Sequence, residues 1–96
     1  MRAYVIVDIE VLDPVKYEEY RMLAQSSLAV YGGRYLVRGG RTEAFEGSWA
    51  PGRLVILEFD SPARAKEWYN SPEYGKARAA RRNAAKFNMM LAEGLA

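Results

Sequence analysis

The first strongly patterned stretch of the chain, residues 3–11, alternates between two kinds of position. Its odd positions are all apolar, whereas its even positions mix apolar residues with Asp8 and Glu10. Successive side chains of a strand point to opposite faces, so this pattern predicts a strand with one wholly apolar face and one mixed face. Asp13 and Pro14 follow, and these residues suit the N-cap and the first position of a helix. We therefore expect a strand that leads directly into a helix.

Aromatic and apolar residues recur at steps of three and four after Pro14, which predicts a helix with one apolar stripe. The residues of this stripe are Tyr17, Tyr20, Ala24, Leu28 and Tyr31. Gly32–Gly33 supplies the left-handed conformation with which many helices end. We therefore expect the helix to stop at this pair of glycines.

A second strand is predicted to begin at residue 35 and to continue past Gly39–Gly40 to Glu46. Paired glycines within a strand indicate a bulge, or a place where another group approaches the backbone closely. Residues 47–52 have the composition of a loop. Residues 53–59 are nearly all apolar, which predicts a third strand in the middle of its sheet.

Two Ser-Pro pairs, Ser61–Pro62 and Ser71–Pro72, predict that the next helical region is split. Serine is a favoured N-cap and proline is tolerated in the first turn, so each pair predicts the start of a helix. We expect these helices at 62–70 and 72–83. Residues 87–91 predict a last strand, with a further stretch of helix as the alternative.

The predicted order is strand, helix, strand, strand, helix, strand, which is the split βαβ order of ferredoxin-like folds. Right-handed crossovers then place the helices on one face of a four-stranded antiparallel sheet, with the first and third strands in its centre. The chain has 96 residues, which is enough for one small domain. We therefore expect residues 1–96 to form a single ferredoxin-like α+β domain.

The second face of this sheet is apolar although no helix is predicted to cover it. Tyr4 and Ile6 of the first strand share this face with Leu54 and Ile56 of the third. Burial of apolar surface is worth about 25 cal/mol per Å², so leaving this face in water would destabilise a small domain appreciably. The pattern predicts a homodimer in which a second copy covers the face.

Composition removes several kinds of chemistry. The chain has no Cys and no His, which excludes disulfides, thiolate nucleophiles, zinc fingers and histidine-based triads. Neither a P-loop nor a Rossmann glycine pattern is present, and no paired acidic motif has metal-ligand spacing. We therefore expect no cofactor and no metal. The start of the chain enters a strand pattern directly, without a signal-peptide block or a long apolar run, which predicts a cytoplasmic protein and no membrane partner.

The charge is nearly balanced, with 14 Lys and Arg against 12 Asp and Glu. Residues 61–96 hold seven basic and three acidic residues, and most of the excess lies between Lys76 and Lys86. Such a run can bind phosphates, but it is more typical of a solvated helix face. We therefore expect no nucleic-acid partner.

Asp8, Glu58 and Arg38 form the candidate polar site. Asp8 and Glu58 fall on the same predicted sheet face, and Arg38 precedes Gly39–Gly40 on the neighbouring strand. Two carboxylates and a guanidinium suit acid–base catalysis or the binding of a small polar molecule, and Gly39 and Gly40 would leave backbone amides accessible. The alternative is a salt-bridge network at the dimer interface.

Four aromatic residues are further candidates for ligand contact: Tyr17, Trp68, Tyr69 and Tyr74. The last three gather around the predicted helix break. Aromatic residues at helical spacing are more often core residues, so core packing is the alternative. Trp49 lies in the predicted loop, where an indole is expected to touch a partner subunit or to close a cavity.

The ordered set of motifs resembles the small bacterial proteins of the domain of unknown function 1330 family. The resemblance covers nearly the whole chain. The matching pieces are Asp13–Pro14 with Tyr17 and Tyr20, Gly32–Gly33, Arg38–Gly39–Gly40, Glu46–Gly47, Val55 to Phe59 with Glu58, Ser61–Pro62, Trp68–Tyr69 and Ser71–Pro72–Glu73–Tyr74. The resemblance implies a dimeric α+β barrel in which two sheets enclose a small cavity. It implies no reaction, because the family has none assigned.

These features predict a homodimer that binds a small polar or aromatic molecule in a cavity between the sheet and the helices. One alternative, by analogy of fold, is a cofactor-independent oxygenase or isomerase. In that case Asp8 or Glu58 would accept a proton, and Arg38 would stabilise an enolate or carboxylate. The other alternative is a structural dimer without a ligand.

Overall fold

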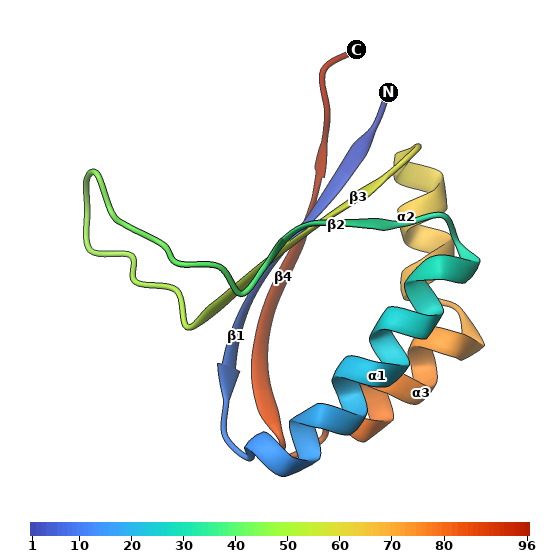
Figure 1. Ribbon diagram of the computed structural model, residues 1–96. Coiled ribbons are helices and arrows are strands. Elements are labelled where there is room, and N and C mark those ends of the chain that lie inside the picture. Colours follow the sequence, from blue (N-terminus) through green and yellow to red (C-terminus); the bar gives the residue numbers. More distant parts are fainter.

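Four strands form one antiparallel sheet, and three helices cover a single face of it (Figure 1). The computed structural model comprises all residues from 1 to 96. The elements are β1 (Ala3–Val11), α1 (Pro14–Val30), β2 (Arg34–Arg38), β3 (Arg53–Phe59), α2 (Pro62–Tyr69), α3 (Pro72–Ala80) and β4 (Ala85–Glu93). The strand order β2-β3-β1-β4 places β1 and β3 in the centre. The predicted ferredoxin-like α+β fold is confirmed.

Each helix begins at a side chain that caps it. The Asp13 carboxylate accepts hydrogen bonds from the backbone N–H groups of Val15 and Lys16 at 3.1 and 3.2 Å. Ser61 and Ser71 cap α2 and α3 in the same way, and a proline follows each of the three caps. These side chains satisfy amides that have no partner within the helix. The split of the second helical region at Ser71, which the sequence predicts, is therefore present.

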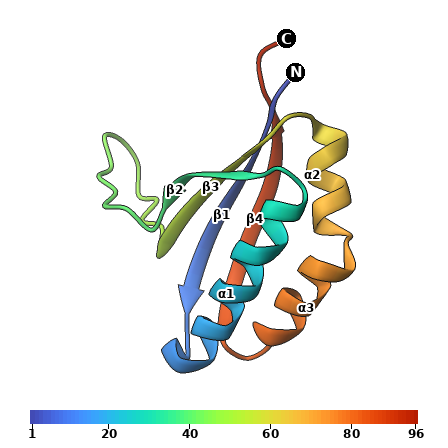
Figure 2. The ribbon, with the colours of Figure 1, turned by 45° about the vertical axis from the view of Figure 1, so that its right-hand side comes forward.

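The core lies between the sheet and the helices, which run side by side over the same face (Figure 2). The odd positions of β1 from Ala3 to Ile9 are buried there, as the alternation predicts, and Val11 is partly buried. Trp68 of α2 and Tyr74 of α3 pack together with ring centroids 4.1 Å apart. The indole N–H of Trp68 donates to the Ser27 hydroxyl of α1 at 3.0 Å. The aromatic cluster thus joins the three helices to one another.

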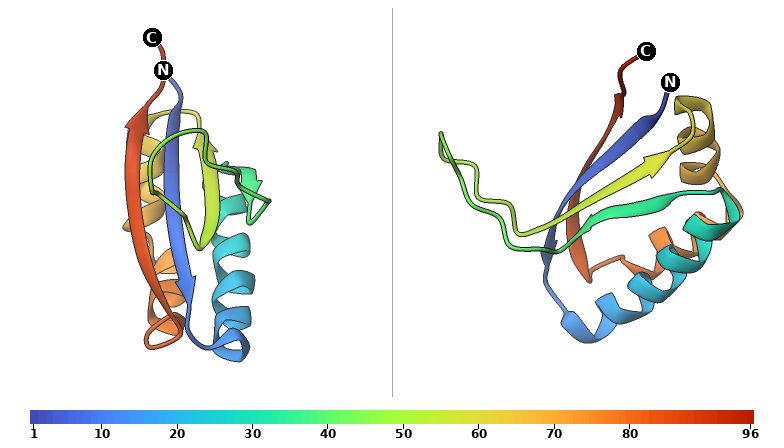
Figure 3. Two further views of the ribbon diagram at one scale, coloured as in Figure 1. Left: turned by 90° about the vertical axis from the view of Figure 1, so that its left-hand side faces the viewer. Right: turned by 45° about the horizontal axis from the view of Figure 1, so that its top comes forward.

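The second strand is shorter than its pattern predicts. It ends at Arg38, and residues 39–52 form an irregular loop that extends away from the helices (Figure 3). Gly39 has φ +71° and turns the chain out of the sheet. The bulge predicted at the glycines lies instead between Tyr35 and Val37. The prediction of a strand that continues to Glu46 is therefore wrong.

The last strand is confirmed against its helical alternative, because β4 pairs with β1 from Ala85 to Glu93. As an edge strand next to β1, β4 also contributes to the face of the sheet that no helix covers. On that face one apolar row crosses all four strands, and its members in spatial order are Val37, Ile56, Ile6 and Met90. Met90 keeps 63% of its surface exposed. We call this face of the sheet the outer face.

Candidate functional site

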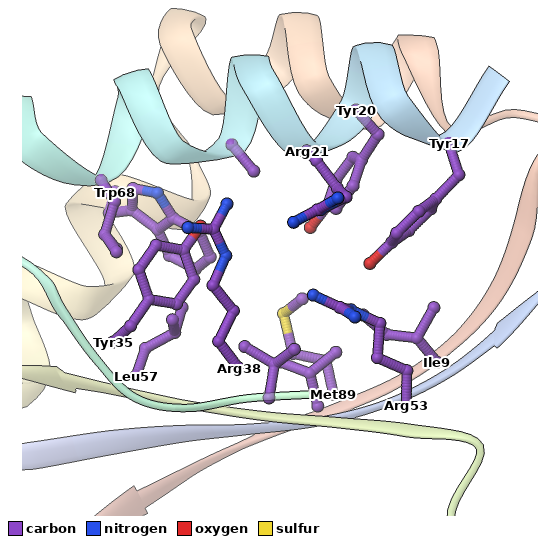
Figure 4. A pocket seen from close by; sticks show the side chains of 14 residues that line it. Ile9, Tyr17, Tyr20, Arg21, Tyr35, Arg38, Arg53, Leu57, Trp68 and Met89 are labelled. Atoms are coloured by element: carbon purple, nitrogen blue, oxygen red, sulfur yellow. The ribbon is translucent and has the colours of Figure 1, made fainter. Parts of the chain in front are cut away.

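A cleft lies between α1 and the helix-facing side of the sheet (Figure 4). One row of paired residues crosses the four strands beneath it, and all of its members line the cleft: Arg38, Val55, Val7 and Met89. The free space is about 440 Å³ with the open mouth included, and about 30 Å³ of it admits the centre of a water molecule. That inner space holds only a few waters, so an organic ligand would fit only after long side chains moved aside.

The upper wall of the cleft is one stripe of α1. Tyr17, Arg21, Ala24 and Leu28 recur at steps of three and four, so they point to the same side of the helix. Tyr20 lies beside this stripe, and its hydroxyl is 2.9 Å from that of Tyr74. When Tyr74 donates in that hydrogen bond, the Tyr20 hydrogen is free for an acceptor in the cleft.

Three arginines provide the only charges of the cleft lining. Eleven of the fourteen lining residues are hydrophobic, and the other three are Arg21, Arg38 and Arg53. Arg21 reaches in from α1, whereas Arg38 and Arg53 reach in from the ends of β2 and β3 (Figure 4). No Asp or Glu lines the cleft. Its electrostatic potential is therefore positive, because a guanidinium stays protonated in proteins.

Two of these guanidinium groups carry a buried nitrogen without a hydrogen-bond partner. They are Nε of Arg21 and Nε of Arg53. Nη1 of Arg21 is engaged, since it donates to Glu18 at 2.8 Å near the surface. Arg38 differs, because its Nη2 donates to Gln25 at 2.9 Å and its Cζ lies 4.4 Å from the Tyr35 ring centroid. A buried donor without an acceptor destabilises a protein, so such atoms mark a place where an acceptor fits.

The phenols of the cleft remain protonated at neutral pH. Burial raises the pKa of Tyr17, although Arg53 nearby opposes the rise. Burial also raises the pKa of Tyr35, against the influence of Arg38. The pKa of Tyr20 is raised as well, first by burial and then by Tyr74. These hydroxyl groups can therefore donate hydrogen bonds to a ligand in the cleft.

The predicted cluster of Asp8, Glu58 and Arg38 does not form. Asp8 and Glu58 do lie on the outer face, but their partners on the neighbouring strand are Leu54 for Asp8 and Tyr4 for Glu58. Arg38 points to the other side of the sheet. The bulge between Tyr35 and Val37 shifts the alternation of β2 by one residue, so Arg38 shares the face of Val55. The prediction grouped Arg38 with the carboxylates because it precedes Gly39–Gly40 on the strand beside them, and it did not include this shift.

Each carboxylate of the predicted cluster has a structural partner on the outer face. Asp8 accepts from the Trp49 indole N–H at 3.0 Å and from the Gly52 amide at 2.9 Å, which ties the 39–52 loop to β1. Glu58 accepts from Nε and Nη2 of Arg34 at 3.0 and 2.9 Å. These hydrogen bonds, together with Arg2, lower the pKa of Glu58. For Glu58 the structure matches the alternative of a salt-bridge network.

The other predicted contacts are divided between cleft and core. Tyr17 and Trp68 line the cleft. Tyr74 is completely buried in the core. Tyr69 lies outside the cleft and packs its ring near that of Tyr74, with centroids 5.8 Å apart. Gly39 and Gly40 do not line the cleft, but Gly39 lies against the Arg53 side chain.

Arg21 and Arg53 are cleft residues that the sequence reasoning missed. The position of each arginine in the hydrophobic pattern of the sequence indicated this location. Arg21 follows Tyr17 by four residues and so belongs to the apolar stripe of α1. Arg53 precedes Val55 by two residues and so falls on the buried face of β3. A charged residue on a predicted buried face is the observation that identifies both.

Neither a metal centre nor a membrane span is visible in the structure. No three Asp or Glu side chains lie close enough together to hold a metal ion. None of the three helices combines the length and apolarity needed to cross a bilayer.

The comparison with known families is decisive for the identity of the chain. The model of the family described as Domain of unknown function (DUF1330) matches residues 2–95. The chain belongs to this family. No match was found among curated proteins. The resemblance inferred from the ordered motifs is therefore confirmed.

Solved structures share the fold of this DUF1330 protein at low sequence identity. A protein of unknown function from Rhodopseudomonas palustris aligns with TM-score 0.74 and 17% identity, over 99% of this chain and 83% of that one. SnoaB, a cofactor-independent oxygenase from Streptomyces nogalater, aligns with TM-score 0.67 and 10% identity, over 99% and 94%. A protein from Thermobifida fusca, described as dimeric, ferredoxin-like and of unknown function, aligns with TM-score 0.66 and 10% identity, over 98% and 92%. These likenesses establish the fold.

Proposed function

We propose that this DUF1330 protein is a homodimer that binds a small aromatic molecule with a polar group in the cleft between α1 and the sheet. The observation that carries the proposal is the pair of buried, unpaired nitrogens, Arg21 Nε and Arg53 Nε, in a cleft that is otherwise mostly hydrophobic. Small-molecule sites commonly combine an apolar lining with a few well-placed polar groups. A ligand that accepts hydrogen bonds from these nitrogens satisfies groups that the folded chain leaves unsatisfied.

The cleft residues suit reversible binding better than the acid–base roles first considered for the sheet carboxylates. Asp8 and Glu58 lie on the outer face, so neither reaches a ligand in the cleft. The low pKa of Glu58, which its hydrogen bonds from Arg34 cause, also makes it a weak base. The oxygenase or isomerase alternative therefore receives no support from its two proposed bases, although Arg38 does line the cleft.

The uncovered apolar row on the outer face is the reason for proposing a homodimer. This row, which includes Ile6, Ile56 and Met90, has no covering helix, and Met90 is 63% exposed. A second copy of the chain presents the same row, so packing about a two-fold axis buries both. The structural neighbour from Thermobifida fusca is described as dimeric, which supports this arrangement.

Light scattering on a size-exclusion peak tests the dimer. At micromolar concentration the protein should have twice its chain mass of 10.9 kDa. Met90→Lys should shift the peak to the monomer, because it places a charge in the apolar row. Met22→Lys is the matched control, since Met22 is a 69% exposed methionine on α1. A wild-type monomer contradicts the dimer proposal.

Trp68 fluorescence tests binding in the cleft. Trp68 lines the cleft and Trp49 does not, so Trp49→Phe leaves one indole that reports on the cleft. Titration with benzoate and with benzamide should give a saturable signal for at least one of them. Ala24→Leu, which fills the upper wall, should abolish the signal, whereas Ala29→Leu on the exposed side of the same helix should not. No saturable signal from either compound contradicts the proposal.

A further inference from the structure

The charged residues that line the cleft all carry a positive charge. Arg21, Arg38 and Arg53 line it, and no carboxylate does. The ion pairs of the protein include Arg21 with Glu18 but none with Arg38 or Arg53. Arginine does not relieve such repulsion by losing its proton, because a guanidinium stays protonated in proteins. Arg38 and Arg53 therefore carry permanent positive charges without a carboxylate partner in the chain, and an anion is the species that neutralises them.

We propose that the ligand of the cleft is an aromatic carboxylate, whose carboxylate group lies between Arg21 and Arg53 and whose ring lies on the apolar floor. This inference rests on the proposed function and adds the chemical class of the ligand. Arg21 and Arg53 point into the cleft from opposite walls, α1 and β3 (Figure 4). In the proposed arrangement one planar anion accepts hydrogen bonds from both. The fork of a guanidinium matches the two oxygens of a carboxylate in geometry.

Tyr17 extends the anion site on the side of α1. Cζ of Arg53 lies 6.0 Å from the Tyr17 ring centroid, so the phenol and the guanidinium face the same part of the cleft. The Tyr17 hydroxyl remains protonated at neutral pH and can donate to a carboxylate oxygen. Donors from a helix and a strand thus surround the position that the anion occupies.

The apolar floor favours a carboxylate on a ring over a small inorganic anion. Val7, Val55 and Met89 form this floor and offer no hydrogen bond from their side chains. Phosphate carries up to two charges and is strongly hydrated, so it gains nothing from contact with these residues. A benzene ring that packs on the same residues removes apolar surface from water, which favours binding. The floor and the arginines together therefore select a molecule with one flat apolar part and one anionic part.

Titration of Trp49→Phe protein with benzoate, benzamide and inorganic phosphate at pH 7 and constant ionic strength tests the inference, with Trp68 fluorescence as the signal. Benzoate and benzamide differ in charge but hardly in shape. Benzoate should bind at least tenfold more tightly than benzamide. Arg53→Gln and Arg21→Gln should each weaken benzoate binding about tenfold and weaken benzamide binding clearly less, because a neutral carbonyl accepts a weaker hydrogen bond than a carboxylate does. Arg82→Gln, an exposed arginine that does not line the cleft, should change neither.

The outcomes separate this inference from the proposed function. If benzamide binds as tightly as benzoate, the cleft is a binding site but its ligand is not an anion. If phosphate binds as tightly as benzoate, the assignment of an aromatic carboxylate as the ligand is wrong. An equal loss of benzoate binding in Arg82→Gln and Arg53→Gln would show an effect of net charge alone, which overturns the inference. If neither benzoate nor benzamide binds, the inference and the proposed function both fail.

Discussion

Gly39 leaves the space that the Arg53 guanidinium occupies. A Cβ atom on residue 39 would overlap Nη1 and Cζ of Arg53. Gly39 also has φ +71°, a conformation that residues with a Cβ rarely adopt. The glycine at the end of β2 therefore places an arginine of β3 in the cleft, although it does not line the cleft itself.

Gly39→Ala should weaken benzoate binding about as much as Arg53→Gln does, because the new methyl group displaces the guanidinium. It should also lower the free energy of unfolding by about 1–2 kcal/mol, because of the positive φ. Gly40→Ala is the matched control, since a Cβ there meets no atom within 4 Å. Fluorescence titration and urea unfolding measure the two effects. Equal benzoate affinity in the two variants would show that Gly39 does not position Arg53.

Ser27→Ala should lower the free energy of unfolding by about 1–3 kcal/mol. The Ser27 hydroxyl accepts the hydrogen bond of the buried Trp68 indole at 3.0 Å, and alanine leaves that N–H without an acceptor. Ser26→Ala is the control, because Ser26 is exposed on the same helix and bonds only to the Met22 carbonyl. Urea unfolding should show a change below about 0.5 kcal/mol for it. Similar losses in both variants would contradict the role assigned to Ser27.

Ser71→Ala should destabilise the protein by about 1–2 kcal/mol, because the Ser71 hydroxyl accepts from the Tyr74 amide at 3.0 Å and donates to the Trp68 carbonyl at 2.6 Å. Pro72→Ala should cost less, since an amide at the first helical position has no helical partner to lose. Chemical denaturation of both variants shows which substitution lowers the free energy of unfolding more. The reverse order would mean that the cap does not stabilise the start of α3.

Acid should destabilise the protein in part through Glu58. Hydrogen bonds from Arg34 hold the pKa of this carboxyl below its ordinary value. A carboxyl whose pKa is lower in the folded state stabilises the fold at pH values above about 4.3. This stabilisation is lost as the pH falls through the folded-state pKa. Glu58→Gln should therefore lose less stability than wild type between pH 5 and about pH 2–3 in urea unfolding.

Glu43→Gln controls for the loss of one negative charge, because Glu43 lies in the exposed loop and takes part in no ion pair. This variant should follow the wild-type pH profile. A Glu58→Gln profile that coincides with wild type would show that the ion pair with Arg34 does not contribute to the acid response.

The sequence predicted the fold because its local signals agree with one another. The alternation in β1, the cap at Asp13 and the Ser71–Pro72 break each lead to the element that the structure contains. Such consistency between pattern, capping and packing is typical of sequences that specify one structure. The exception is the region after β2, where glycines that end a strand look the same in sequence as glycines within one.

The candidate site was harder to predict, because a single bulge decides which side chains meet. The extra residue in β2 has no distinctive sequence signal, yet it moves Arg38 from the outer face to the cleft. Arg53 needed no such information, since its position in the alternation of β3 already places it with Val55. The expectation that carboxylates do the chemistry drew attention to Asp8 and Glu58 instead.

The central claim is that Arg21 and Arg53 hold the ligand through their unpaired nitrogens. The most direct measurement is the NMR spectrum of the arginine Nε–Hε groups during a titration with benzoate. The Nε–Hε signals of Arg21 and Arg53 should shift progressively and saturate, and their hydrogens should exchange more slowly with water, while the signal of Arg82 stays in place. If the signals of Arg21 and Arg53 do not move when Trp68 reports saturation, the cleft does not hold its ligand through these arginines.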